Sequence, residues 1–176
     1  TPGEKFSYSN VGYRLLGMLI EKISAQSYWE FLENRIFMPI GMKNTRSSDP
    51  KTIIPKRAAG YGRIEDSYEN RDAVTESAAF SQGALVSSAL DLAKWDAALY
   101  EERILKRSSL ETMWTSEILN NGSTTGYGLG WFINKEDSKK TVFHSGGLPG
   151  FTTFIHRNLS SKTTFILLAN LECYPY

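Results

Sequence analysis

Two short stretches of the chain hold residues that could move protons and bind a substrate. The first is Tyr8-Ser9-Asn10. In an extended backbone, the side chains of residues i and i+2 point to the same side. We therefore expect Tyr8 and Asn10 to face a cleft together, while Ser9 turns away and caps a helix. Because the reference pKa of tyrosine is about 10, Tyr8 can act as a base at neutral pH only beside positive charge.

The second stretch, His144-Ser145-Gly146-Gly147, lies at the end of a predicted strand. Glycines let backbone N–H groups approach a ligand closely, which an oxyanion hole requires. Histidine gains or loses its proton near neutral pH, so His144 is a candidate catalytic residue. We expect Ser145, Gly146 and Gly147 to contact the substrate. Gln82, beside the small residues that follow it, is a candidate for lining the same pocket, with a plain loop role equally open.

No metal or cofactor is expected. His144, His156 and the single cysteine, Cys173, lack the short paired spacings of metal sites. Cys173 is predicted to be a small apolar filler, and His156 to be structural or exposed. The glycines of the segment 126–130 lead into a predicted strand and not a helix, which argues against a dinucleotide-binding loop.

The composition is typical of a folded globular chain, and its charge balance gives no electrostatic attraction to polyanions. The sequence has 176 residues, of which 41% are hydrophobic, and 20 Lys and Arg against 19 Asp and Glu give a formal net charge of +1. Such a balance offers no field for nucleic acid or an anionic membrane, so a small-molecule or peptide-like substrate is the expected partner. No apolar run approaches the roughly 20 residues that span a bilayer.

Helices are predicted over the first part of the chain. Val11, Leu15, Leu19 and Ile23 repeat every four residues, which predicts a helix over 10–24 with a core-facing stripe. Further helices are predicted over 27–37, ended by Pro39, over 89–99 and, more briefly, over 108–119. The segment 43–77 is broken by prolines and glycines and is predicted to be a long loop with short elements.

Strands are predicted after residue 126. The segments 130–133, 141–144, 151–155 and 163–168 are β-branched, aromatic and separated by turn residues, as in an antiparallel meander. The fold class is therefore α+β, with a mainly helical region over 1–125 followed by an antiparallel sheet over 126–171.

Five segments, in order, resemble one known family. They are 2–13, with a Tyr-x-Asn motif at Tyr8 and Asn10, then 39–45, 57–61 and 126–131, and last His144-Ser145-Gly146. Together they resemble serine β-lactamases of the class C type, D,D-peptidases and other penicillin-binding-protein-like enzymes, and their esterase relatives. The resemblance implies a β-lactamase/transpeptidase-like fold, no cofactor, and acyl transfer on an ester, a D-amino-acid peptide or a β-lactam-like amide. It also implies a bacterial cell-envelope or secreted setting, although the sequence does not show the compartment.

In the family that the chain resembles, a serine in a Ser-x-x-Lys motif is the nucleophile. The resemblance implies that Tyr8 moves its proton, that Asn10 holds the substrate amide and that the Gly147 N–H is an oxyanion donor. Histidine in place of lysine at His144 favours an esterase or peptidase over a β-lactamase. The nucleophile motif should precede Tyr8.

The only Ser-x-x-Lys of the chain runs from Ser48 to Lys51, in a predicted loop. A nucleophile needs its lysine one helical turn away on a rigid face, which argues against this match. We therefore expect residues 1–176 to form one incomplete domain that lacks the nucleophile segment and is inactive alone.

Two alternatives remain open. The chain could be a pseudoenzyme that serves as a non-catalytic binding or interaction module, or one part of a cleaved enzyme that keeps an N-terminal companion segment. If upstream strands and a downstream helix complete the sheet, the visible strands have an uncovered edge and face, which favour self-association or a partner.

Overall fold

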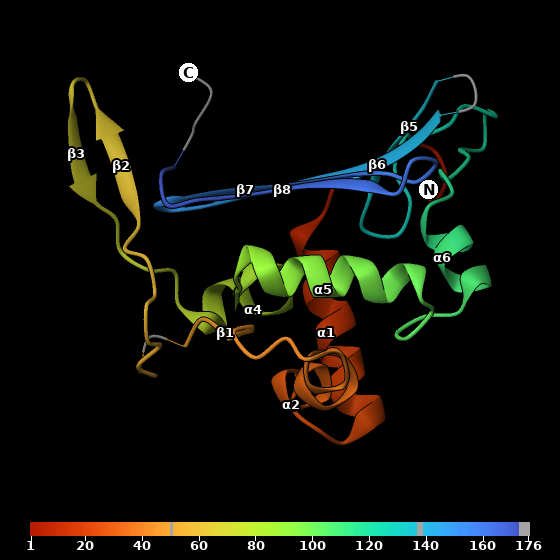
Figure 1. The fold of residues 1–176 in the computed structure, drawn as a ribbon. Helices are drawn as coiled ribbons and strands as arrows, with labels where there is room; N and C mark the ends of the chain where they lie inside the picture. Colours follow the sequence, from red (N-terminus) through yellow and green to blue (C-terminus); the bar gives the residue numbers. More distant parts are fainter. Residues whose placement is uncertain (50, 137–138, 173–176) are drawn as a thin grey trace.

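The computed structural model describes residues 1–49, 51–136 and 139–172, and Figure 1 shows their arrangement. The helical elements are α1 (Asn10–Ser24), α2 (Tyr28–Leu32), the π-helix η1 (Glu33–Phe37), α3 (Met38–Ile40), α4 (Glu76–Gly83), α5 (Ala89–Tyr100) and α6 (Arg107–Met113). The strands are β1 (Arg46–Ser47), β2 (Tyr61–Ile64), β3 (Ser67–Asn70), β4 (Leu85–Val86), β5 (Phe132–Glu136), β6 (Lys139–Leu148), β7 (Phe151–Asn158) and β8 (Thr163–Ala169). The prediction of an α+β fold is confirmed.

The main sheet is an antiparallel meander in the order β5-β6-β7-β8, as the sequence predicts. In its register Val142 of β6 faces Arg157 of β7, and Phe143 faces His156. Because successive side chains alternate between faces, Val142 and Arg157 share one face and Phe143 and His156 share the other. Figure 1 shows α5 lying along the face below the sheet in that view, and Val142 and Arg157 are fully buried.

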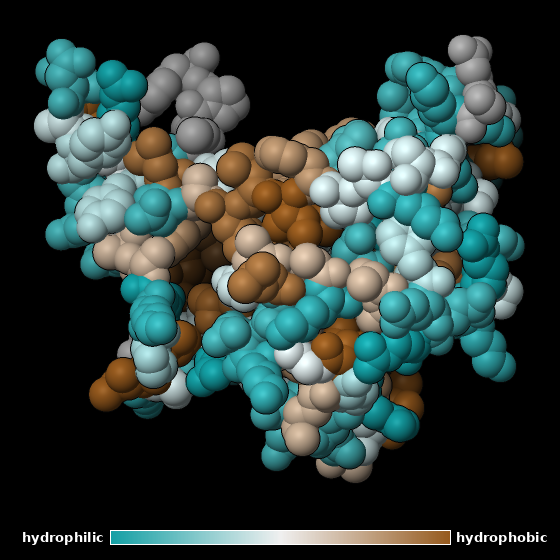
Figure 2. Space-filling view, in the orientation of Figure 1, coloured by the Kyte–Doolittle hydropathy of each residue, from teal (hydrophilic) through white to brown (hydrophobic). Residues whose placement is uncertain are grey.

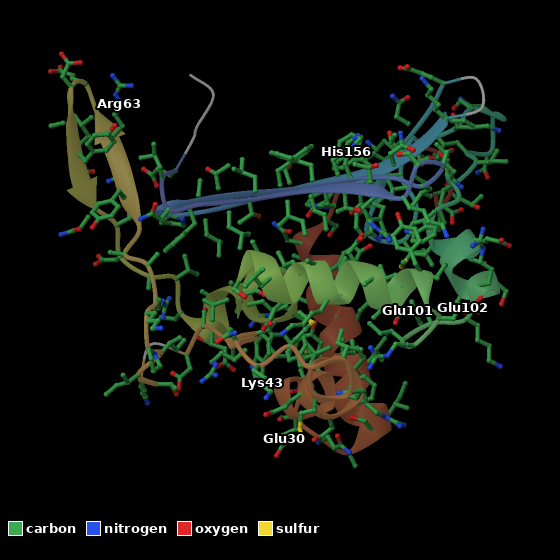
Figure 3. The ribbon with its side chains drawn as sticks, viewed as in Figure 1. Glu30, Lys43, Arg63, Glu101, Glu102 and His156 are labelled. Carbon is green, nitrogen blue, oxygen red and sulfur yellow. The ribbon has the colours of Figure 1, made fainter. Side chains whose placement is uncertain are left out.

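The face of the sheet away from α5 carries an aromatic array. Phe132 stacks on Phe143 with ring centroids 5.4 Å apart, and Phe143 lies 6.1 Å from both Phe154 and His156. Phe165 of β8, which pairs with His156, is 58% exposed. This aromatic face has no covering layer among the described residues (Figure 3, where His156 is labelled).

Helix α1 has the predicted bounds, but its apolar stripe does not face a core. The Ser9 hydroxyl accepts a hydrogen bond from the Gly12 N–H at 3.1 Å, so the predicted cap is confirmed. Val11 is 65% exposed and Ile23 is 84% exposed, so the predicted core-facing stripe is wrong for the described chain. The reason is that α1 packs against α4 through a different side, at Gly17.

The second predicted helix continues past Pro39. It runs through η1 and α3 and ends at Gly41, which has a left-handed backbone with φ of 73°. The π-turn lets the Met38 N–H donate to the Glu33 carbonyl, so Pro39 begins a new turn, where its missing N–H removes no bond. The prediction that Pro39 ends the helix is therefore wrong.

Two further elements differ from the sequence predictions. The helix predicted over 108–119 is the shorter α6, because Trp114 turns into the core and Glu117 pairs with Tyr127. The segment 43–77 contains short elements, as predicted, among them the β2–β3 hairpin, which projects at the left of Figure 1. Helix α4, which has only a weak apolar period, was not predicted.

Candidate active site

Tyr8 and His144, 136 positions apart in the chain, lie side by side. Their ring centroids are 5.9 Å apart at a tilt of 42°. Tyr8 belongs to the extended segment that enters α1, and the Ser9 cap fixes where that segment becomes a helix. His144 comes from β6. The fold therefore joins the two candidate proton-handling residues that the sequence singled out.

Asn10 is the first residue of α1, and its side chain is exposed. No hydrogen bond of the described residues engages it, so its amide is accessible to a ligand. Its role in holding a substrate amide stays a prediction, as do the roles of the other candidate residues.

Gly146 and Gly147 lie within the last three residues of β6, so the strand predicted over 141–144 extends further along the chain. Both are inside β6, opposite Thr153 and Thr152, and the strand continues to Leu148. The turn comes two residues later, at Gly150 with φ of 80°, because that glycine adopts the left-handed backbone that a turn requires. Ser145, Gly146 and Gly147 are exposed along this strand, and the Cβ position of Gly147 faces open space.

His144 is held by two hydrogen bonds. Its Nδ1 lies 2.6 Å from the Ser145 carbonyl oxygen, and its Nε2 lies 3.2 Å from the Tyr127 hydroxyl. Tyr127 is a residue that the sequence interpretation did not single out, although it stands in one of the segments that carry the family resemblance. Its ring also meets Tyr8 edge-on, with centroids 6.0 Å apart.

Tyr127 is the buried member of this group. Burial raises the pKa of Tyr127 well above its usual range, and the neighbouring Tyr13 and Tyr8 hydroxyls raise it further. At neutral pH Tyr127 is therefore protonated and able to donate a hydrogen bond. Tyr8, by contrast, is half exposed and open toward the surface.

Gln82 lies on α4, whereas His144 lies on β6. Its Nε2 donates to the Ala78 carbonyl oxygen at 3.2 Å, and its buried Oε1 has no partner among the described residues. No described hydrogen bond or ring contact links it to Tyr8 or His144. Phe80, two residues earlier, has φ of 27° and breaks α4 into two short pieces. The structure thus shows no hydrogen bond between Gln82 and the other candidate residues.

Ser48 and Lys51 lie outside the helices. The Ser48 N–H donates to the Ala84 carbonyl oxygen at 2.9 Å, and the Lys51 N–H donates to the Asp49 carboxylate at 3.0 Å. This Ser-x-x-Lys match therefore does not have the helical geometry that a nucleophile and its lysine require.

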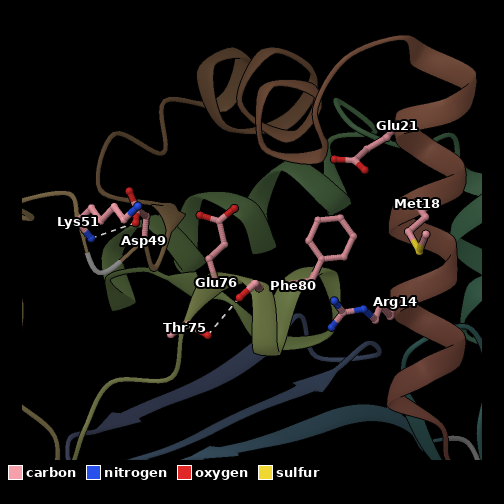
Figure 4. A pocket seen from close by; sticks show the side chains of 9 residues that line it. Arg14, Met18, Glu21, Asp49, Lys51, Thr75, Glu76 and Phe80 are labelled. Carbon is pink, nitrogen blue, oxygen red and sulfur yellow. Dashed lines mark hydrogen bonds between the residues drawn. The ribbon is translucent and has the colours of Figure 1, made fainter.

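A cavity of about 580 Å³ opens between α1, α4 and the side chains of Asp49 and Lys51 (Figure 4). Its carboxylates already have partners: Glu21 accepts from the Tyr28 N–H at 2.9 Å, and Glu76 accepts from the Trp29 indole and from Ser47. None of the candidate catalytic residues lines this cavity. We assign it no part in the chemistry.

The described residues contain no group of three or more His, Cys, Asp or Glu side chains that could hold a metal ion. Cys173, which the sequence predicts to be a small apolar filler, lies outside the described residues. None of the described helices combines the length and the apolar character needed to cross a bilayer.

The sequence profile of the Beta-lactamase family matches residues 1–173. The chain belongs to the beta-lactamase family. This family member is 35% identical to Penicillin-binding protein 4* of Bacillus subtilis (strain 168) over 97% of its own length. The alignment covers 41% of that protein, so the chain spans less than half of this relative.

Solved structures of the same superfamily share the fold. The D-amino acid amidase from Ochrobactrum anthropi SV3 matches 95% of this beta-lactamase family member and 50% of its own chain, with a TM-score of 0.79 and 28% identity. The octameric penicillin-binding protein homologue from Pyrococcus abyssi matches 99% of this chain and 41% of its own, with a TM-score of 0.81 and 32% identity. The predicted family and the predicted β-lactamase/transpeptidase-like fold are confirmed.

Proposed function

We propose that this chain supplies the proton-handling and substrate-holding side of a serine hydrolase that works by acyl transfer. The observation that carries the proposal is the contact between Tyr8 and His144, which brings the Tyr-x-Asn motif onto the His-Ser-Gly strand. The relatives support the reaction class, because one is a penicillin-binding protein and another a D-amino acid amidase. We propose a D-amino-acid amide or peptide as the substrate, with esters and β-lactam-like amides as the other members of the same class.

In the proposed reaction a serine Oγ forms a bond to the substrate carbonyl carbon. Tyr8 takes the serine proton and passes it to the leaving amine or alcohol as the bond to that group breaks. Water then attacks the acyl-serine, and the reverse transfer restores the serine. Asn10 holds the substrate amide, and the Gly147 N–H serves as one oxyanion donor.

The serine comes, in this proposal, from an N-terminal companion segment with a Ser-x-x-Lys motif. Residues 1–176 then form one incomplete domain, and the exposed stripe of α1 and the aromatic face of the sheet are surfaces for that segment or for a second copy. Figure 2 shows hydrophobic residues gathered in the middle of the visible face, at the level of the main sheet. The Pyrococcus abyssi homologue is itself octameric, which supports self-association as the second possibility.

Hydrolysis of D-phenylalanine amide tests the proposal. The polypeptide to use is one in which a Ser-x-x-Lys segment precedes Thr1. Tyr8→Phe should lower kcat about 10²–10⁴-fold, which is the usual contribution of a positioned acid-base group. Tyr68→Phe, on the exposed hairpin, is the matched control and should leave turnover unchanged. Equal rates for both variants would remove Tyr8 from the mechanism.

One observation favours a non-catalytic alternative: the Ser-x-x-Lys match of this chain has no helical geometry. A pseudoenzyme should bind a D-amino-acid amide in calorimetry without converting it, even with its natural upstream sequence attached. Finding Ser-x-x-Lys on an apolar-periodic helix in that upstream sequence decides for the enzyme.

A further inference from the structure

Tyr127 is held rigidly between the two segments that carry the candidate site. Its backbone carbonyl accepts from the Glu117 N–H at 3.0 Å, and its backbone pairs with Phe132 in an isolated bridge. Its ring packs on Phe6 at 5.2 Å and meets Phe132 edge-on at 4.8 Å. Because these contacts hold the Tyr127 side chain in one orientation, it can orient the residues that contact it.

The hydrogen bonds of His144 define where its proton lies. A backbone carbonyl oxygen can only accept, so the 2.6 Å contact with the Ser145 oxygen requires a proton on Nδ1. In the neutral imidazole Nε2 is then a bare acceptor, and the Tyr127 hydroxyl 3.2 Å away must donate to it. The arrangement selects the Nδ1–H tautomer.

The Tyr13 hydroxyl lies near Tyr127 and contributes to raising the pKa of Tyr127, which keeps the Tyr127 proton in place for donation to His144. Gly130, with φ of 81°, leaves room for the Tyr13 hydroxyl, which lies 3.4 Å from the position that a Cβ would take.

We propose that Tyr127 is a positioning residue of the site: its hydroxyl fixes the tautomer and the orientation of His144, while its ring supports Tyr8. The hydroxyl and the ring have separable effects. Tyr127→Phe keeps the ring beside Tyr8 and removes the donor to Nε2, whereas Tyr127→Leu removes both. The importance of the tautomer for turnover rests on the proposed function, but the tautomer itself does not.

Long-range ¹H–¹⁵N NMR of the ¹⁵N-histidine-labelled chain measures the tautomer directly at neutral pH. With the two histidines distinguished by a His156→Asn variant, His144 should show a protonated Nδ1 and an unprotonated Nε2. Tyr127→Phe should raise the fraction with the proton on Nε2, because the donor that opposes it is gone. Tyr100→Phe is the matched control, since the buried Tyr100 hydroxyl has no partner among the described residues, and it should leave the His144 signals unchanged.

Two outcomes would overturn the proposal. One is a wild-type spectrum with the proton of His144 on Nε2, a result that needs no variant to fold. The other is a folded Tyr127→Phe chain whose His144 signals equal those of the wild type. Neither measurement uses turnover, so a failure of the proposed hydrolysis leaves this test intact. In an active polypeptide Tyr127→Phe should lower kcat about tenfold with KM unchanged, which corresponds to about 1.4 kcal/mol of transition-state stabilisation.

Discussion

Helices α1 and α5 look alike as sequence patterns but have opposite surroundings. On α5 the apolar residues Ala98 and Leu99 are 0% and 1% exposed, and the helix packs under the sheet. On α1 the more regular stripe is open, with Leu15 and Leu19 about half exposed. A periodic stripe therefore predicts a helix and the face that will be covered, but not what covers it.

The two helices also differ in how polar groups attach them. Asp96 of α5 binds the fully buried Arg157 of β7 at 2.5 Å, and the Thr164 hydroxyl of β8 donates to the same carboxylate at 2.9 Å. Helix α1 is attached through the Ser81 hydroxyl, which donates to the Tyr13 carbonyl oxygen at 2.9 Å. We infer that α5 stabilises the described fold and that α1 presents a surface for association.

The largest expected effect is on the buried ion pair beneath the sheet. Asp96→Ala should lower the free energy of unfolding by about 3–5 kcal/mol, because it leaves the Arg157 guanidinium buried without its carboxylate. Denaturant unfolding measures the loss. Glu101→Ala, which removes an exposed carboxylate one residue past α5, is the control and should change stability by less than about 0.5 kcal/mol. Similar losses for the two variants would contradict the role of α5.

The next effect concerns Asp91, which attaches α5 to the segment at Asn44 and Thr45, before β1. Burial alone would raise the pKa of Asp91, but hydrogen bonds from Lys94, the Asn44 N–H and Thr45, with the Lys94 charge, outweigh it and hold the pKa below its usual range. Asp91→Asn should cost about 2–3 kcal/mol at neutral pH.

The pH dependence of the Asp91 contribution has a defined sign. Because the folded pKa is lowered, the contribution is complete above the ordinary aspartate pKa of about 4 and is lost as the pH falls through the folded value. Unfolding curves from pH 6 downward should therefore converge for wild type and Asp91→Asn. A constant difference at all pH values would show that the carboxylate charge is not the cause.

A smaller effect is expected for the third member of the buried cluster. Thr164→Val keeps the shape of the side chain and removes the hydroxyl that donates to Asp96, so it should cost about 1 kcal/mol. Thr163→Val, at the exposed start of β8, is the control for the change in strand propensity. If the two substitutions have equal effects on the melting temperature, the hydroxyl is not part of the attachment.

The smallest effect on stability is expected on α1. Leu19→Gln should change the free energy of unfolding by less than about 0.5 kcal/mol, whereas Leu99→Ala on α5 should cost about 2–5 kcal/mol. Leu19→Gln should nevertheless reduce association, measured by light scattering at micromolar concentration. A monomeric wild-type chain, or a loss of stability as large as that of Leu99→Ala, would show that the stripe is not an association surface.

Particular residues show how far the sequence could predict this molecule. The four long strands were predicted because β-branched and aromatic runs alternate with turns, and α1 because Ser9 caps a strict four-residue period. The prediction that the helix ends at Pro39 failed because the effect of this proline depends on the π-turn before it, and no local sequence pattern indicates that turn. The strand predicted over 141–144 extends to Leu148, because Gly146 and Gly147 still pair with β7 although glycine is disfavoured in strands.

The sequence could predict which residues are candidates for the site. It could not predict which residues hold them in place. Tyr8, Asn10 and His144 stand in motifs, so their residue types identified them. Tyr127 was not singled out, because its importance arises from a 3.2 Å contact with a residue 17 positions away. Gln82 was chosen from its neighbours in sequence, which do not show that its side-chain nitrogen donates within α4, to the Ala78 carbonyl oxygen.

The central claim, that Tyr8 activates a serine from a companion segment, is tested most directly by mass spectrometry after labelling with a fluorophosphonate. A polypeptide with the Ser-x-x-Lys segment before Thr1 should gain one adduct on that serine, and Tyr8→Phe should slow its formation by about 10²-fold or more. Residues 1–176 alone should gain none. An adduct on a serine of the isolated chain, or an unchanged labelling rate in Tyr8→Phe, would contradict the account.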